Sequence, residues 1–199
     1  MRRTRVVHRF VGMVLLLPFF AWALTGLIFF IKPGYEGAYE QLSLKTYPLN
    51  TQSPIGPEPG WQELRLIRTI LGDNLLVRTR SGWVNLDATT HQPRNPPSED
   101  QLRTLLNDAF TANPSRYGQI STVNGNSVTT STGVEVTLDW NRMSLQQKGK
   151  DTDRINWLYS IHYLQWTGVK SIDRVAGMVG IGLVLLLTVL GALLAFKRN

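Results

Sequence analysis

The pattern of apolar and polar residues is dominated by two uncharged apolar stretches, at 10–31 and 175–196. Each is 22 residues long and contains no Asp, Glu, Lys, Arg or His. A helix that rises about 1.5 Å per residue needs roughly 20 apolar residues to cross the hydrocarbon core of a bilayer. The pattern therefore predicts a transmembrane helix over 10–31 and a second over 175–196.

Between these stretches the apolar runs are short, partly alternating and separated by turn residues. Runs at 63–70, 75–80 and 83–88 are typical of an antiparallel meander, and further strand-like runs occupy much of 119–147. Between the two groups, apolar residues recur at helical spacing over 102–110. Ser98 precedes this stripe and Gln101 follows three residues later, the pattern of a capping box. The order of strands, helix and strands predicts a small α+β domain over 33–150.

The segment 151–168 has a different pattern. Ile155, Leu158, His162 and Trp166 fall on one stripe of a helix. The segment also carries aromatic residues with polar tips, which are Trp157, Tyr159, Tyr163 and Trp166. Such residues gather where a membrane meets water, so we expect an amphipathic interfacial helix anchored by these four side chains. Packing of the same stripe beneath the 33–150 domain is the alternative.

The charged residues indicate how the chain is oriented. Basic residues flank the outer ends of the two stretches: Arg2, Arg3, Arg5, Arg9, Lys197 and Arg198. Because basic flanks favour the cytoplasmic side, we expect the N-terminus 1–9 and the tail 197–199 to be cytoplasmic. Residues 33–174 then lie on the other side, which would be the periplasm if the membrane is a bacterial inner membrane. The first stretch is longer than the apolar region of a signal peptide, so we expect it to be retained.

The overall composition narrows the function classes. The net charge is +7, but seven of the 21 basic residues lie outside 33–174 while all 14 acidic residues lie inside it. The predicted domain is therefore neutral, without the excess of basic residues that binding to nucleic acid requires. The sequence has no cysteine, which excludes disulfides, thiol chemistry and cysteine-ligated metals.

Short motifs carry a resemblance to a known family. The stretch from His8 to Gly12 leads into the first apolar segment, which contains Trp22-Ala-Leu-Thr-Gly26. Both are similar to motifs of the PepSY-associated transmembrane family, and the run that ends in His162 resembles that family's stretch before its last span. Residues 136–140 resemble a strand of a PepSY domain. The resemblance covers nearly the whole chain in order and implies a PepSY-like domain held between two helices.

The resemblance implies several functions. Larger relatives with four spans are similar to ferric-siderophore reductases, which pass electrons through haems held by histidines and would connect this chain to iron uptake. Other PepSY domains are similar to propeptides that inhibit proteases. This chain departs from the reductase pattern because it has two apolar stretches and three histidines.

The histidines are His8, His91 and His162. Their spacing matches no zinc motif, so we expect no metal site of that kind. The resemblance makes His8 and His162 candidate ligands of haem b, but the first stretch would separate them by roughly 30 Å. A haem would then bridge two subunits or pair one histidine with a partner protein. The alternatives are an interfacial role for His162, a flanking role for His8 and a surface turn for His91.

Small residues within the two stretches favour close helix packing. They are Gly12, Ala21, Gly26, Ala176, Gly180, Gly191 and Ala195. Either the two helices of one chain pack against each other through these residues, or two copies form a homodimer.

No catalytic set is visible in the sequence, so we expect no enzyme activity from the chain alone. The first hypothesis is an inner-membrane anchored PepSY-type accessory subunit that binds a partner in a membrane or periplasmic complex. The second is a haem-binding electron-transfer unit, which would act as a component of a membrane reductase. Inhibition of a protease by the PepSY-like domain is a third hypothesis, by analogy alone.

Overall fold

The computed structural model describes residues 2–49, 55–56 and 58–196 and divides the chain into two compact units. Met1–Tyr35 and Thr152–Asn199 form one unit, here called the helical unit. Glu36–Asp151 forms the other, here called the sheet domain. The predicted domain over 33–150 starts three residues earlier and ends one residue earlier than this unit.

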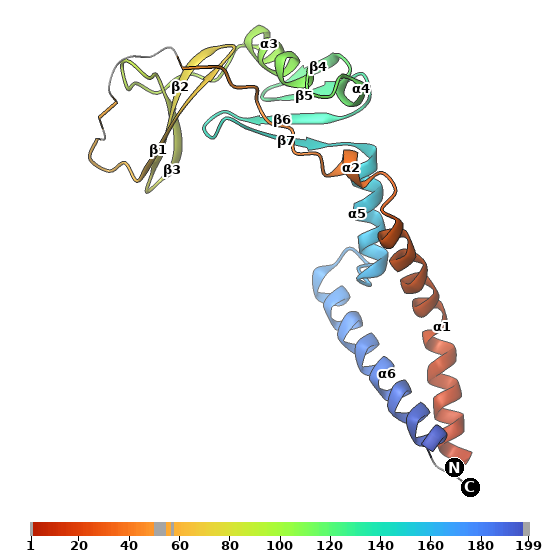
Figure 1. Ribbon diagram of the computed structural model, residues 1–199. Coiled ribbons are helices and arrows are strands. Elements are labelled where there is room, and N and C mark those ends of the chain that lie inside the picture. Colours follow the sequence, from red (N-terminus) through yellow and green to blue (C-terminus); the bar gives the residue numbers. More distant parts are fainter. Residues whose placement is uncertain (1, 50–54, 57, 197–199) are drawn as a thin grey trace. The chain divides into compact units, whose positions relative to one another are not determined.

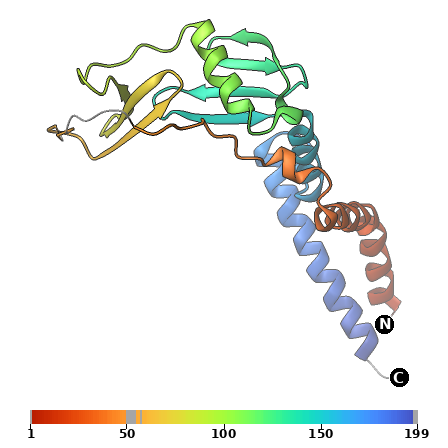
Figure 2. The same cartoon turned by 45° about the horizontal axis from the view of Figure 1, so that its top comes forward.

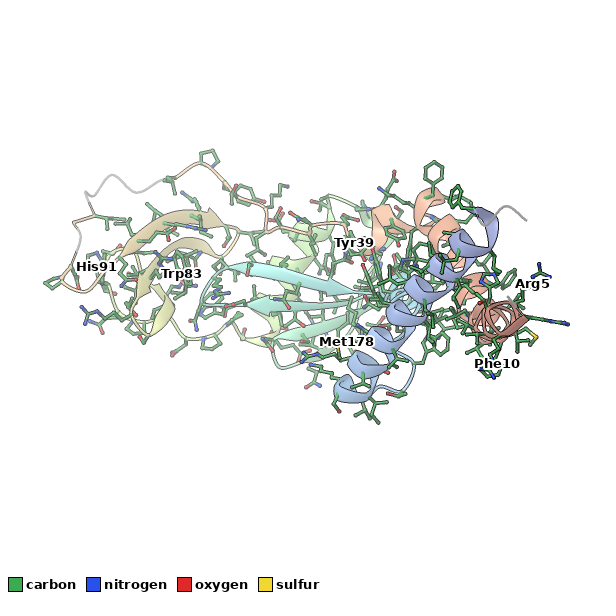
Figure 3. All side chains as sticks on the ribbon, turned by 90° about the horizontal axis from the view of Figure 1, so that it is seen from below. Arg5, Phe10, Tyr39, Trp83, His91 and Met178 are labelled. Atoms are coloured by element: carbon green, nitrogen blue, oxygen red, sulfur yellow. The ribbon has the colours of Figure 1, made fainter. Side chains whose placement is uncertain are left out.

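The helical unit contains the two apolar stretches in α1 (Arg2–Ile31) and α6 (Lys170–Phe196). Both helices are long and apolar enough to cross a membrane. They run antiparallel (Figure 1), with His8 of α1 beside Gly191 of α6 and Gly12 beside Leu187. Large apolar side chains remain exposed on both helices, and Figure 3 labels two of them, Phe10 and Met178. This apolar outer surface fits a membrane protein.

Both long helices begin before the apolar stretches that predicted them, at Arg2 and at Lys170. Arg and Lys are good helix formers, so the helix continues through the polar flanks. Figure 2 shows that α1 bends along its length, and Pro18 is the proline inside it. Proline removes a backbone hydrogen bond and its ring collides with the preceding turn, which accounts for a bend there.

The predicted interfacial helix over 151–168 is too long at its C-terminal end. In the structure α5 covers Lys150–His162 and a turn follows it. Leu164 and Gly168 have φ angles of 57° and 74°, in the left-handed region that an α-helix does not contain. The aromatic stripe that we read as one helix is therefore divided between α5 and the connection to α6.

The sheet domain contains two antiparallel sheets. The first has three strands in the order β1-β2-β3, with β1 (Glu63–Thr69), β2 (Gly72–Thr79) and β3 (Gly82–Leu86). The second has four strands in sequential order, with β4 (Ile120–Asn124), β5 (Ser127–Thr130), β6 (Glu135–Asp139) and β7 (Ser144–Lys148). The predicted meander and the strands that follow the helix are confirmed, and the structure adds that they form separate sheets.

The predicted helix between the two sheets is confirmed as α3 (Glu99–Phe110). Ser98 is its N-cap, the Ser98 side chain accepts from the Gln101 backbone N–H, and the Gln101 side chain accepts in return from the Ser98 N–H. The apolar stripe of α3 packs into the main core with the inward side chains of β5 and β6. Buried members of this core include Leu102, Leu105, Leu106, Phe110, Tyr117, Val128, Val136 and Leu138.

Buried polar side chains join the two sheets inside the domain. The Asn85 side-chain amide donates to Asn74 Oδ1 and to the carbonyl of Trp140, at 3.2 Å in each case. Arg94 Nη1 also donates to Asn74 Oδ1, at 2.8 Å, and the Trp140 indole N–H donates to the carbonyl of Arg94. Because buried polar groups are costly when unpaired, this network fixes how the sheets meet.

Candidate functional site

His162, at the end of α5, lies among aromatic side chains of the helical unit. Its ring stacks on Trp22 of α1, with centroids 5.4 Å apart and planes inclined by 19°. Phe29 and Tyr163 meet the imidazole edge-on, at 5.0 and 5.5 Å. Tyr159 stacks in turn on Phe29 at 4.6 Å. The structure therefore brings the end of α5 against the last part of α1, in agreement with Figure 1.

A hydrogen bond fixes the orientation of the His162 ring. Nδ1 lies 2.9 Å from the hydroxyl of Thr25, whose side chain is buried. The same hydroxyl lies 2.8 Å from the carbonyl of Ala21 and 3.0 Å from that of Trp22. When the hydroxyl donates its single hydrogen to one of these carbonyls, Thr25 accepts the hydrogen bond from Nδ1–H. The imidazole lone pair is then on Nε2, which makes no hydrogen bond to any described residue.

His8 lies near the other end of the helical unit, in the second turn of α1. Its Nδ1 atom is buried and has no hydrogen-bond partner in the described part of the chain. A methyl group on Gly191 of α6 would come within 3.4 Å of His8 Cε1, so the glycine lets the imidazole approach α6 closely. His8 and Thr25 are separated along α1 by about 25 Å at about 1.5 Å per residue. The structure therefore does not bring His8 and His162 together.

The small residues divide between the interior and the outside of the helical unit. Gly12 and Gly191 face the opposite long helix, Gly26 faces His162, and Gly180 faces Leu164. A methyl group on Gly180 would lie 3.3 Å from Leu164 Cδ1. Ala21 is partly buried, whereas Ala176 and Ala195 are exposed on α6. These four glycines thus face side chains of their own chain, whereas the two alanines are exposed.

The four predicted anchor residues differ in how far their side chains are exposed. Trp157, Tyr163 and Trp166 are more than half exposed, at 61%, 60% and 52%. Tyr159 is partly buried because it stacks on Phe29 and Tyr163. Three of the four are therefore exposed, as the prediction of interfacial anchors requires, whereas Tyr159 packs against the aromatic side chains around His162.

His91 lies in the sheet domain, in the loop after β3 (Figure 3), with a φ angle of 56°. Its Nδ1 lies 2.6 Å from a carboxylate oxygen of Glu58, and its ring meets Trp61 edge-on. Nearby, the Asp87 carboxylate accepts from the backbone N–H groups of Thr90 and Thr89, which lower the pKa of Asp87. The surface-turn interpretation of this region is confirmed.

Sequence reasoning missed a partly buried ionic cluster in the sheet domain. Arg116 belongs to α4 (Pro114–Tyr117), and its side chain is only 12% exposed. Its guanidinium donates to Asp151 Oδ2 at 2.8 Å and to Gln147 Oε1 at 2.7 Å, and it lies 3.7 Å from Glu40. The Gln147 side chain then donates to the carbonyls of Gly37 and Glu40.

This cluster connects the first and last residues of the sheet domain. A Cβ on Gly37 would lie 2.6 Å from Arg116 Nη1, and a Cβ on Gly149 would lie 2.6 Å from Asp151 Oδ1. Both glycines therefore make room for the ion pair. An open cavity of about 320 Å³ adjoins it, lined in part by Ser115, Thr132 and Lys150. No sequence pattern predicted this cluster, because its members come from distant segments: Arg116 lies 31 residues from Gln147 and 35 residues from Asp151.

The Arg116 cluster and the histidines of the helical unit differ in whether their polar atoms are already hydrogen-bonded. Every nitrogen of the Arg116 guanidinium is directed at an oxygen of the same cluster, so its charge is used within the domain. The helical unit instead has His162 Nε2 and His8 Nδ1, neither of which is hydrogen-bonded to a residue that the structure describes. In the described residues, no group of three or more His, Cys, Asp or Glu side chains could hold a metal ion by itself.

Comparisons with known proteins found no relative of this chain. No family model matches the sequence, and no curated protein or solved structure matches it either. The relationship to the PepSY-associated family therefore stays a prediction from the short motifs. The structure does bring two of those motifs into contact. Trp22 and Thr25, of the motif from Trp22 to Gly26, contact His162, at the end of the later motif.

Proposed function

We propose that this chain is a membrane-anchored protein that binds haem through His162 and serves in electron transfer. The observation that carries the proposal is the hydrogen bond between His162 Nδ1 and the Thr25 hydroxyl, with Thr25 as the acceptor, within a group of aromatic side chains. Histidines that bind metals usually donate their second ring N–H to a fixed acceptor, which sets the tautomer and orients the ring. Thr25 is positioned to act as this acceptor.

The residues around His162 fit a flat apolar cofactor. Trp22, Phe29 and Tyr163 provide aromatic surface around the imidazole, and a Cβ on Gly26 would lie 4.0 Å from His162 Cε1, so the glycine leaves space beside that edge of the ring. A bound haem would supply one-electron redox chemistry. The protein's own residues hold the imidazole, leave Nε2 as the ligating nitrogen and keep water from Nδ1.

A haem with two histidine ligands needs a second imidazole, and His8 of the same chain is about 25 Å away along α1. We therefore propose that a second copy of the chain, or a partner protein, supplies it. His8, whose buried Nδ1 has no partner among the described residues, would serve a second haem near the other end of α1 in the same way.

The proposal includes the placement in the membrane. α1 and α6 would span an inner membrane with both termini in the cytoplasm, because the basic flanks Arg2, Arg3, Arg5 and Arg9 precede the apolar part of α1. The sheet domain would then lie on the opposite side, in the periplasm.

The test is the absorption spectrum of the full-length chain, purified in detergent from haem-supplied cells and measured oxidised and after reduction. We expect a Soret band and sharp reduced α and β bands. His162→Ala should remove the bands or lower haem content several-fold. Thr25→Val, which keeps the side-chain shape, should shift the midpoint potential or weaken haem retention about tenfold, within the range for lost outer-sphere partners.

The matched control for Thr25 is Thr188 of α6, whose hydroxyl also donates to a carbonyl four residues earlier but is not hydrogen-bonded to a histidine among the described residues. Thr188→Val and His91→Ala should leave the spectrum unchanged. A colourless wild-type protein from haem-replete cells would overturn the proposal. So would a spectrum that survives His162→Ala and His8→Ala together.

A second candidate function is that of an accessory subunit whose sheet domain binds a protein partner. One observation favours it: α3 covers one face of the four-stranded sheet, while the other face carries exposed Thr129, Glu135, Gln146 and Lys148. Because the chain has no cysteine, Gln146→Cys gives a single site for a thiol-reactive crosslinker in native membranes. We expect Gln146→Cys to give a reproducible crosslinked adduct that a Glu99→Cys control on α3 does not give. Equal crosslinking of the two variants would count against the accessory-subunit function.

A further inference from the structure

The connection between α5 and α6 exposes apolar and aromatic side chains next to basic ones. Tyr163, Trp166, Val169 and Ile172 are 60%, 52%, 48% and 53% exposed. The Trp166 indole N–H donates to the carbonyl of Ile161, so this ring is held against the end of α5 and leaves half its surface uncovered. Amphipathic rings of this kind are typical of the level of lipid headgroups.

Two basic residues follow on the first turns of α6. Lys170 and Arg174 are four residues apart and therefore lie on one face of the helix, and both are exposed. Neither forms an ion pair with any residue that the structure describes. The acid between them, Asp173, is only 9% exposed and accepts from the backbone N–H and the hydroxyl of Thr167.

This arrangement conflicts with the usual charge distribution of membrane proteins. In the orientation proposed above, Lys170 and Arg174 lie on the non-cytoplasmic side, where basic residues next to a span are disfavoured. Asp173 could have offset them, but it is turned toward the 163–169 connection. Two cations are thus left at the expected headgroup level, without an ion pair to any carboxylate that the structure describes.

We propose that Lys170 and Arg174 bind the phosphate of an anionic phospholipid in the non-cytoplasmic leaflet, with Trp166 and Tyr163 packing against the same lipid. A phosphate diester offers oxygen acceptors that an ammonium and a guanidinium can share. The neighbouring aromatic rings supply apolar surface for the glycerol and the upper acyl chain. This inference depends on the membrane placement of the proposed function and is independent of haem.

The test is native mass spectrometry of the full-length protein, offered equal amounts of phosphatidylglycerol and phosphatidylcholine. We expect wild-type protein to retain phosphatidylglycerol about tenfold more than phosphatidylcholine, given the attraction of juxtamembrane basic residues for anionic lipid. The double variant Lys170→Gln with Arg174→Gln should bring this ratio close to one. The charge-keeping variant Lys170→Arg with Arg174→Lys should retain most of the preference.

Arg65→Gln with Arg80→Gln in the sheet domain is the matched control, because it removes the same charge from exposed residues elsewhere. An equal loss of preference in this control would overturn the proposal, since net charge alone would then explain the binding. Equal retention of the two lipids by wild-type protein would also overturn it. The absorption spectrum of the Lys170→Gln and Arg174→Gln variant should match wild type, so failure of lipid binding and failure of haem binding are distinguishable.

Discussion

Arg116 shows what a single residue does for the sheet domain. Its guanidinium pairs with Asp151 and Gln147 while it is largely buried, and these partners hold Gly37 and Glu40 through the Gln147 amide. A buried charge is tolerated only where hydrogen bonds and an opposite charge replace water. Arg116 therefore holds the beginning and the end of the sheet domain together.

We predict that Arg116→Met lowers the free energy of unfolding of the sheet domain by about 3 kcal/mol, because Asp151 and Glu40 lose their partner while partly buried. Arg116→Lys should recover only part of this loss, since an ammonium cannot replace the planar guanidinium. Urea unfolding of the detergent-solubilised chain, followed by tryptophan fluorescence, measures the change.

The control is Arg103, which pairs with Glu99 at 2.8 Å on the exposed side of α3. Arg103→Met should cost less than about 0.5 kcal/mol, as exposed pairs of this spacing do. A similar cost at both positions would contradict a special role for Arg116.

Asp87 predicts a dependence of stability on pH. The backbone N–H groups of Thr90 and Thr89 lower its pKa in the folded state below 3.8. The carboxylate therefore stabilises the fold above pH 3.8, and this contribution is lost as the pH falls through the folded pKa. Asp87→Asn keeps an acceptor but cannot ionise, so the stability difference between about pH 6 and about pH 3 should shrink. An unchanged difference in urea midpoints would show that Asp87 does not contribute to it.

At the scale of elements, α3 owes its start to a reciprocal pair of hydrogen bonds between Ser98 and Gln101. We predict that Ser98→Ala costs about 1 kcal/mol, because the Gln101 backbone N–H loses the Ser98 hydroxyl that accepts its hydrogen bond. Thr104→Ala is the comparison, since Thr104 lies inside α3 with its hydroxyl bonded to the Asp100 carbonyl. It should be neutral or slightly stabilising, because alanine is the better helix former. A thermal scan of the three proteins decides between these outcomes.

The close approach of α1 and α6 at Gly191 leaves little room for a side chain there. A methyl group there would already lie 3.4 Å from His8 Cε1, so a larger side chain must push α1 and α6 apart or displace the imidazole. We predict that Gly191→Leu destabilises the helical unit, whereas Gly182→Leu, at a glycine with open space around it, does not. The temperature at which the detergent-solubilised protein aggregates is the measurement, and equal shifts in both variants would contradict the packing.

At the scale of the whole molecule, the chain consists of a helical unit and a sheet domain, joined at Tyr35 and Glu36 and again at Asp151 and Thr152. If both termini are cytoplasmic, an impermeant thiol reagent applied to cells with a permeable outer membrane should label Gln146→Cys but not Arg5→Cys. Both should be labelled after the inner membrane is dissolved. Labelling of Arg5→Cys in intact cells would reverse the orientation that the basic flanks predict.

The amino-acid sequence by itself determined the two apolar helices, the strands of the sheet domain and α3 with its capping box. These features are local: a run of 22 apolar residues, a two-residue alternation or a serine three residues before a glutamine can be read without knowing what packs where. The end of α5 was predicted too far along the chain, because Leu164 adopts a left-handed conformation that its residue type does not signal.

Only the tertiary structure decided which distant residues meet. Thr25 and His162 are 137 positions apart, and Arg116 and Asp151 are 35 apart, so no periodicity connects them. The sequence left open whether the small residues serve the chain's own packing, and the structure places Gly12, Gly26, Gly180 and Gly191 against side chains of the same chain. Such pairings depend on how folded elements bury their apolar faces against one another, which is settled by packing across the whole unit and not by any single segment.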